Sequence, residues 1–76
     1  MYKLPQLSGE EVTAVLMRHF GFVQVSQRGS HVKLRRMREG KIITTIVPLH
    51  KELALGTLRG ILELAGIEPD EFIKFI

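Results

Sequence analysis

Two short glycine-containing turns divide the middle of the chain into three β-rich segments. Gly29-Ser30 separates the first segment from the second, and Arg38-Glu39-Gly40 separates the second from the third. Turns of this kind between β-rich segments are typical of hairpins, in which consecutive strands are antiparallel neighbours. We therefore predict three antiparallel strands, at Phe22 to Gln27, about His31 to Met37, and Lys41 to Val47.

Side-chain alternation in the second segment separates an apolar face from a basic one. Val32 and Leu34 fall on one face, and His31, Lys33 and Arg35 fall on the other. An antiparallel sheet commonly buries one face and leaves the other open. The apolar face is expected to form the core, and the face with His31 is expected to be open.

The first segment alternates in the same way. Val23 and Val25 are expected on one face, and Gln24 and Ser26 on the other. Arg36 breaks the alternation of the second segment, which fits a strand that ends as it reaches the Arg38-Glu39-Gly40 turn. The side chains predicted to line the open face are Gln24, Ser26, His31, Lys33 and Arg35.

Helices are predicted before and after the β-rich segments in the chain. Ser8-Gly9-Glu10-Glu11 matches a capping box, and Gly21 suits the position after a helix end. Thr57 can cap a second helix that ends at Gly66, and Pro69 can open a short third one. The apolar stripes are Val12, Val15, Leu16 and His19 or Phe20, then Leu58, Ile61, Leu62 and Ala65, then Phe72, Ile73 and Ile76.

The order α-β-β-β-α-α predicts an α+β fold, with a three-stranded antiparallel sheet and helices packed on one face. A chain of 76 residues is expected to form a single domain, residues 1–76. It contains no cysteine, which excludes disulfides and thiolate metal sites. No apolar run approaches the roughly 20 residues of a membrane span, and the first residues lack the apolar core of a signal peptide. A cytoplasmic location is the expectation.

The charge of the chain is unevenly distributed. The net charge is +3, but residues 28–41 carry six cations against one acid, and residues 52–76 carry five acids against two cations. A basic middle indicates a polyanionic partner, with RNA or DNA as the first expectation. The alternative is a solvated strand face with no nucleic-acid role.

Several kinds of catalytic site are excluded by the motifs. Gly56-Thr57-Leu58-Arg59-Gly60 lacks the length and the lysine of a phosphate-binding loop. No pair of carboxylates occurs among the strands, which argues against two-carboxylate hydrolysis and carboxylate-bound Mg²⁺. Ser30 has no nucleophile elbow around it. His31 and His50 lack further ligands for zinc, so no metal and no cofactor is predicted.

Three histidines remain as titratable groups. His19 lies in the last turn of the first predicted helix and is interpreted as structural. His50 is either a secondary acid–base group or an imidazole that pins the loop, and we favour the structural role. An imidazole at His31 can accept a proton from a ribose 2′-hydroxyl or donate one to a leaving 5′-oxygen, and Lys33 and Arg35 can stabilise the anionic transition state. A histidine beside cations can equally bind phosphate without catalysis.

The chain resembles the HicA family of small toxins from type II toxin–antitoxin systems. The resemblance runs through Leu4-Pro5, Leu7 to Val12, His19 to Phe22, Gln27 to His31, Val47 to Leu53, Gly56 to Leu62, Ala65-Gly66-Ile67 and Glu71-Phe72. It implies a double-stranded-RNA-binding-like fold, ribosome-independent endoribonuclease (mRNA interferase) activity, and inhibition by a HicB antitoxin that covers the active site. The histidine after Gly-Ser is the family's catalytic residue, and His31 occupies that position.

Three hypotheses follow. In the first, the protein is an endoribonuclease toxin acting on RNA, with His31 as general acid or base and no metal. Arg28, Lys33 and Arg35 bind phosphates, and Gly29-Ser30 orients the strand so that the imidazole faces RNA. In the second, the same face is a non-catalytic RNA-binding module. In the third, the basic face binds an acidic protein.

Overall fold

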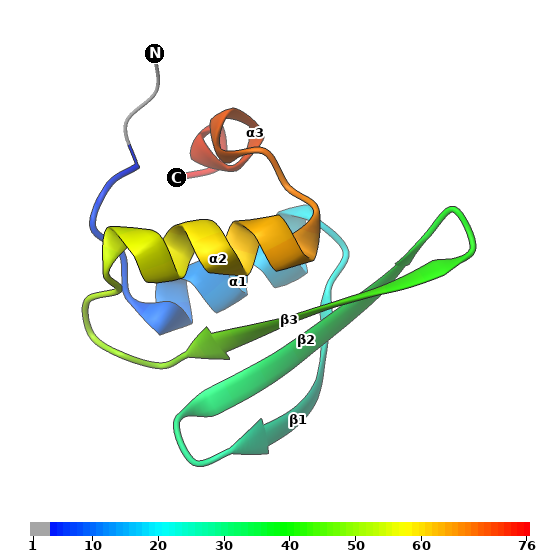
Figure 1. Cartoon of the computed structure of the whole chain (residues 1–76), viewed down its shortest axis with the longest axis horizontal. Helices are drawn as coiled ribbons and strands as arrows, with labels where there is room; N and C mark the ends of the chain where they lie inside the picture. The colour runs from blue at the N-terminus through cyan, green and yellow to red at the C-terminus, as the bar shows by residue number, and fades with distance from the viewer. Residues whose placement is uncertain (1–3) are drawn as a thin grey trace.

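The computed structural model describes residues 4–76 and shows a three-stranded sheet with two helices on one face and a third at one end (Figure 1). The predicted α-β-β-β-α-α order is confirmed, and so is the sheet order β1-β2-β3 with antiparallel neighbours. This arrangement is double-stranded-RNA-binding-like. The elements are α1 (Gly9–His19), β1 (Val23–Arg28), β2 (His31–Arg38), β3 (Lys41–Pro48), α2 (Leu55–Ala65) and α3 (Pro69–Ile73).

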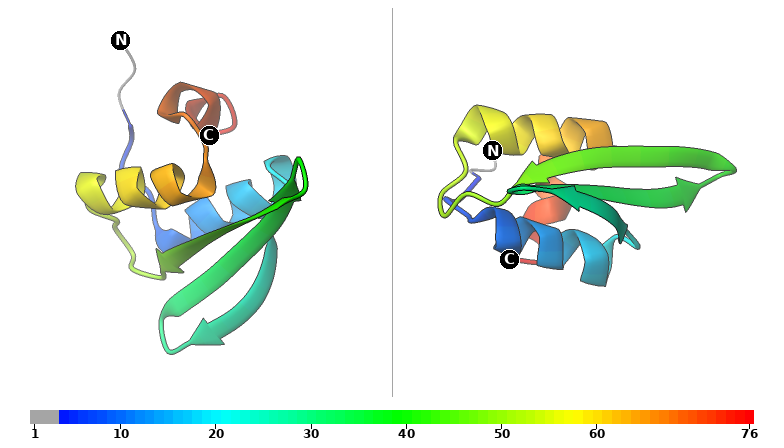
Figure 2. Two further views of the ribbon diagram at one scale, coloured as in Figure 1. Left: turned by 45° about the vertical axis from the view of Figure 1, so that its right-hand side comes forward. Right: turned by 90° about the horizontal axis from the view of Figure 1, so that it is seen from below.

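The core lies between the sheet and the layer formed by α1 and α2. Val32 and Leu34 alternate along β2 and are almost completely buried, while their neighbours on that strand are more exposed; Val47, opposite Val32 on β3, is also buried. The two helices lie next to each other on that side of the sheet (Figure 2). The opposite face of the sheet is left open, as predicted.

The start of α1 follows the capping box. The backbone N–H of Glu11 donates to Ser8 Oγ at 3.0 Å, and the Ser8 N–H donates to Glu11 Oε1 at 2.9 Å. Val12 and Leu16 are buried as predicted. Of the two candidates for the last core position, Phe20 packs against the core and His19 is exposed.

The predicted start of α2 is wrong. The helix begins at Leu55 after Ala54, with no side-chain cap, and Thr57 lies inside it. The physical reason is tertiary: the N–H of Leu53 donates to the carbonyl of Leu7 at 2.8 Å, which positions the chain for an earlier start. The predicted buried stripe of α2 is confirmed, and Gly66 ends the helix in the left-handed conformation, with φ of 70°.

Helix α3 begins at Pro69 and buries Phe72 completely. Ile73 is half-buried, but Ile76 is 47% exposed and does not belong to the helix, so the predicted apolar side of the helix does not include Ile76. Ile76 lies beyond the helix end, where helical spacing no longer governs its direction. No helix in residues 4–76 has the length and apolar character that a membrane crossing requires.

A bulge in β1 overturns the predicted alternation there. Gln24 pairs with Leu34 and Ser26 pairs with Lys33, so Val25 is an extra residue on β1. Gln24 therefore lies in register with the helix-facing side of β2, and of the two polar residues predicted on the open face of β1, Ser26 alone reaches it. The alternation argument fails because one inserted residue reverses the face of every later side chain.

Arg36 lies within β2, which ends at Arg38, one residue past the predicted end at about Met37. Its guanidinium lies on the helix side, where Nη1 donates to the carbonyl of Phe20 at 2.9 Å and Nη2 donates to the carbonyl of Ala65 at 3.1 Å. These carbonyls are at the C-terminal ends of α1 and α2. Arg36 thus ties both helix ends to the sheet, and its guanidinium stacks 4.9 Å from the Phe22 ring centre.

Two close contacts hold the other end of the molecule together. A Cβ at Gly9 would overlap the carbonyl oxygen of Pro48, so only glycine allows α1 to approach the end of β3 this closely. The N–H of Gly9 donates to the carbonyl of His50 at 2.9 Å. In the middle of the core, the buried Thr45 hydroxyl donates to the carbonyl of Ile61 at 2.9 Å.

Candidate nucleic-acid interface

The site is built on the turn between β1 and β2. Arg28 pairs with His31 across a two-residue turn, and Gly29 has φ of +59°, as the first position of a type II′ turn requires. The N–H of Leu49 donates to the carbonyl of Ser30 at 2.6 Å, which ties this turn to the segment after β3. The start of β2 at His31 is therefore fixed by its pairing with Arg28 on β1 and by the bond from Leu49 to the adjacent Ser30.

A hollow of about 480 Å³ lies on the open face beside this turn. It is lined by Ser26, Gln27, Arg28, His31, Lys33 and Ile46. His31 and Lys33 are alternate residues of β2, so both stand on the same face. The bulge brings Ser26 opposite Lys33 from one side, and the β2–β3 register brings Ile46 opposite Lys33 from the other.

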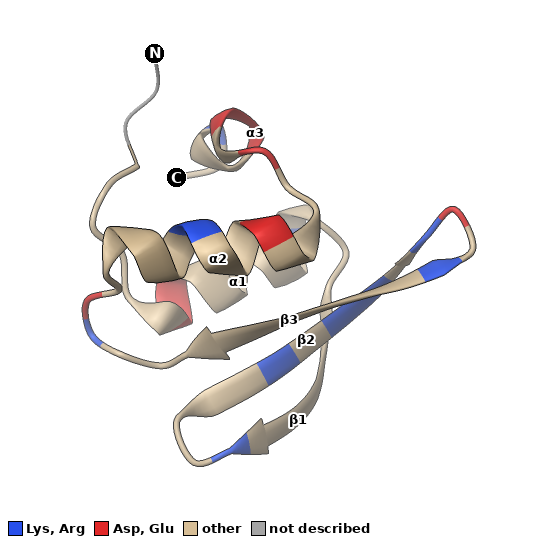
Figure 3. Ribbon diagram, viewed as in Figure 1, with Lys and Arg blue, Asp and Glu red and all other residues tan. Residues whose placement is uncertain are grey.

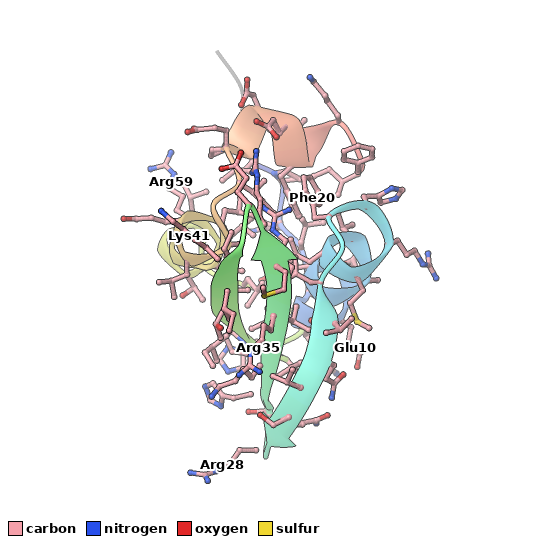
Figure 4. The ribbon with its side chains drawn as sticks, turned by 90° about the vertical axis from the view of Figure 1, so that its right-hand side faces the viewer. Glu10, Phe20, Arg28, Arg35, Lys41 and Arg59 are labelled. Carbon is pink, nitrogen blue, oxygen red and sulfur yellow. The ribbon has the colours of Figure 1, made fainter. Side chains whose placement is uncertain are left out.

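The predicted RNA-binding residues are only partly gathered at the hollow. Arg28 and Lys33 line it, and Gly29 and Ser30 form the adjacent turn. Arg35 is two residues beyond Lys33 on the same face, pairs with Thr44, and lies outside the hollow. Figure 4 shows Arg28 at one end of the sheet and Arg35 well along it, so the cations form a row along the sheet.

The other two histidines lie away from this hollow. His50 borders a separate hollow of about 250 Å³ with Ser8 and Glu10 at the start of α1, and its backbone carbonyl accepts the bond from Gly9. His19 stacks on the ring of Phe75, with ring centres 4.4 Å apart and planes inclined by 15°. Neither imidazole lines the hollow that contains His31.

The electrostatic character of the site comes from β2 and its two turns. Lys and Arg follow β2 and both turns, whereas most acidic residues lie on the helices (Figure 3). Arg36 does not belong to this set, because it faces the helices; burial lowers its pKa, Arg38 lowers it further, and Glu71 acts in the opposite direction. Within residues 4–76, no three His, Cys, Asp or Glu side chains are grouped so that they could hold a metal ion.

This arrangement can bind a phosphodiester and move a proton next to it. Arg28 and Lys33 supply positive charge, Ser26 supplies a hydroxyl, and His31 supplies a group that can donate or accept a proton. Sequence reasoning did not assign Ser26, Gln27 or Ile46 to the site. Alternation did place Ser26 on the open face, and Gln27 is adjacent to Arg28 in the chain. Ile46 joins the site through the β2–β3 register, which local pattern does not specify.

The comparison with protein families identifies the chain. No curated protein and no solved structure gives a significant match. The model described as "HicA toxin of bacterial toxin-antitoxin" matches residues 9–67, which span α1, the whole sheet, α2 and its glycine end. The chain therefore belongs to the HicA toxin family of bacterial toxin–antitoxin systems.

Proposed function

We propose that this chain, as a single domain of residues 1–76, is an endoribonuclease toxin that cleaves RNA, most directly mRNA, in the cytoplasm. His31 acts as general acid or base without a metal. Arg28, Lys33 and Arg35 bind the phosphates, and Gly29-Ser30 orients the start of β2. A HicB-type antitoxin inhibits the activity by covering the open face.

One observation carries this proposal: His31 shares a single hollow on the open face with two cations and a hydroxyl. The hollow of about 480 Å³ falls within the size range of small-molecule sites, which is enough for one nucleotide unit. Family membership supports the toxin role, and the geometry supports an anionic ligand at His31. The same cations would attract RNA through its phosphates.

The chemistry requires two proton transfers. The ribose 2′-oxygen attacks the adjacent phosphorus and loses its proton, the bond from phosphorus to the 5′-oxygen breaks, and that oxygen gains a proton. The products are a 2′,3′-cyclic phosphate and a 5′-hydroxyl. Since His31 is the only imidazole that lines the hollow, we assign it one transfer and assign the other to solvent.

The cations have different tasks in this scheme. Lys33 and Arg28 face the hollow and would stabilise the extra negative charge on the phosphorus centre. Arg35, further along β2, would bind a neighbouring phosphate of the same strand. Loss of Arg35 should therefore weaken binding more than turnover, whereas loss of Lys33 should affect both.

The test is incubation of single-stranded RNA with the purified chain in EDTA over a range of pH, beside His31→Ala and His50→Ala variants. Wild type and His50→Ala should cleave, and His31→Ala should lose roughly 10²- to 10⁴-fold in rate, the usual contribution of one acid–base group. Equal cleavage by wild type and His31→Ala would refute the assignment of His31. Loss of activity in His50→Ala alone would transfer the role to His50.

A non-catalytic RNA-binding module is the second candidate. It is favoured by one observation: among residues 4–76, none of the side-chain hydrogen bonds involves the His31 imidazole, so no protein group orients it for proton transfer. In this case RNA would stay intact in the assay while binding remained strongly dependent on salt.

A further inference from the structure

Strand β3 forms one edge of the sheet, and its free backbone groups can be assigned residue by residue. The N–H of Leu49 donates to Ser30, which makes these two residues a hydrogen-bonded pair next to the pair of His31 and Pro48. Hydrogen-bonded and non-hydrogen-bonded pairs alternate along an antiparallel ladder. The backbone groups that point away from β2 are therefore those of Ile42, Thr44, Ile46 and Pro48.

The central part of this edge, residues 42–47, lacks the usual protection against pairing. Edge strands are commonly protected by charged residues, proline or a bulge. On the other edge of the sheet, β1 has its bulge at Val25. On β3, residues 42–47 carry no charge and are all Ile, Thr or Val, and the protective residues lie at the two ends of the strand, Lys41 at its start and Pro48 at its end. Ile42 and Ile46, whose backbone groups point outward, are 63% and 38% exposed.

We propose that β3 pairs antiparallel with β3 of a second copy of this chain, with Thr44 facing Thr44 of the second copy on the two-fold axis. This register places Ile42 opposite Ile46 of the second copy, and Ile46 opposite its Ile42. All three outward-facing residues would exchange backbone hydrogen bonds with the second copy, and Pro48 would limit the ladder because it has no N–H. An interface of this kind presents the same residues on both sides, as two-fold symmetry requires.

The pattern of charge favours a second copy over an acidic protein. Apart from Lys41 at its start, the edge carries no charge, so the complementarity that residues 42–47 present is β-branched and apolar, and the same segment of a second copy matches it. Lys33 and Arg35 lie on β2, one strand further in. In the dimer Arg35 would be about 14 Å from its equivalent, at about 4.8 Å per strand, and Lys33 would be farther still from its own, because its partner Ile46 is offset from the axis. Both separations exceed the roughly 8 Å Debye length at physiological salt.

Helix α2 leaves room for this pairing. Arg59 and Glu63 border a hollow beside α3, so the charged side of α2 is turned toward α3. Thr57, Gly60 and Leu64 follow helical spacing on another side of α2, are exposed and carry no charge. A Cβ at Gly60 would meet nothing within 4 Å. A two-fold axis through β3 would bring the α2 helices to the same side of the joined sheet.

The dimer would also change the site beside His31. Ile46 lines the hollow that contains His31 and also lies at the β3 edge. Ile42 of the second copy would stand opposite Ile46 and extend the apolar border of that hollow. The pairing itself does not depend on the proposed ribonuclease activity.

Sedimentation equilibrium of the full chain, from about 1 μM to about 1 mM, tests the association, since small interfaces bind in this range. Wild type should dimerise, and more strongly at higher salt, because screening reduces repulsion between two chains of charge +3. Ile42→Lys should raise the dissociation constant at least about tenfold. Met37→Lys is the matched control: Met37 pairs with Ile42 from β2, is 65% exposed and is not at the edge. It should leave the dissociation constant within about twofold.

Amide hydrogen exchange supplies a second measurement that does not depend on the variants. The N–H groups of Ile42, Thr44 and Ile46 should become protected as wild type is concentrated. A monomer at all concentrations would overturn the proposal. A dimer that survives Ile42→Lys would also overturn it. So would a dimer that Met37→Lys dissociates, because the open face would then be the interface. Protection of these amides only after an antitoxin is added would assign the edge to that protein instead.

Discussion

Arg36 is expected to be the most important charged residue for stability, although it takes no part in the proposed site. Its guanidinium donates to the carbonyls of Phe20 and Ala65 and stacks on Phe22. Both carbonyls are at helix C-terminal ends, where a cation is favoured by the helix dipole. Replacing Arg36 with Met keeps an unbranched aliphatic side chain and removes the guanidinium, with its donors, its charge and its stacking on Phe22.

The magnitude follows from these contacts. A hydrogen bond from a charged donor contributes about 1.5–3 kcal/mol, and Arg36 makes two. Its Nε is buried without a hydrogen-bond partner among residues 4–76, which offsets part of this gain. We therefore expect Arg36→Met to lower the free energy of unfolding by about 2–4 kcal/mol. That is a large share of the roughly 4–11 kcal/mol typical of a domain this size.

Urea denaturation followed by circular dichroism measures this change, and Arg35→Met is the control. Arg35 is the next residue along β2 but is exposed on the open face, so its replacement should change the free energy of unfolding by less than about 0.5 kcal/mol. In thermal unfolding, the midpoint for Arg36→Met should fall by roughly 10–30 °C. If Arg36→Met were as stable as Arg35→Met, the interpretation of Arg36 as the link between both helix ends and the sheet would be wrong.

Three further predictions concern single contacts. Gly9→Ala should lower the free energy of unfolding, measured in urea, by about 2 kcal/mol or more, because its Cβ would overlap the Pro48 carbonyl. Gly60→Ala, which has open space around it, should raise the free energy of unfolding by about 0.5–1 kcal/mol. Equal effects would contradict the close approach at Gly9. Ser8→Ala should lower the free energy of unfolding by about 1 kcal/mol, measured in the same way, because it removes the cap on the Glu11 N–H. Lys33→Ala should weaken RNA binding and reduce the slope of log K against log salt by about 1, measured by fluorescence anisotropy; an unchanged slope would mean that Lys33 contacts no phosphate.

Local features of the sequence were enough to predict the elements and their order. The capping box at Ser8, the Gly29 turn and the Gly66 helix end depend on residues within a few positions of one another, so short-range pattern identifies them. The buried stripe of α2 follows from helical spacing for the same reason. The position of His31 and Lys33 on one open face also follows from alternation alone, because no bulge interrupts β2.

Tertiary structure decided which residues join these elements into a site. The bulge at Val25 moved Gln24 off the open face, and the β2–β3 register brought Ile46 beside His31. Arg36 disturbs the alternation, yet its partners are 16 and 29 residues away along the chain. Caps, turns and buried stripes are set by neighbours in the chain, so the sequence alone predicted them. Strand register and long-range hydrogen bonds depend on which segments meet in space, so the sequence alone did not predict them.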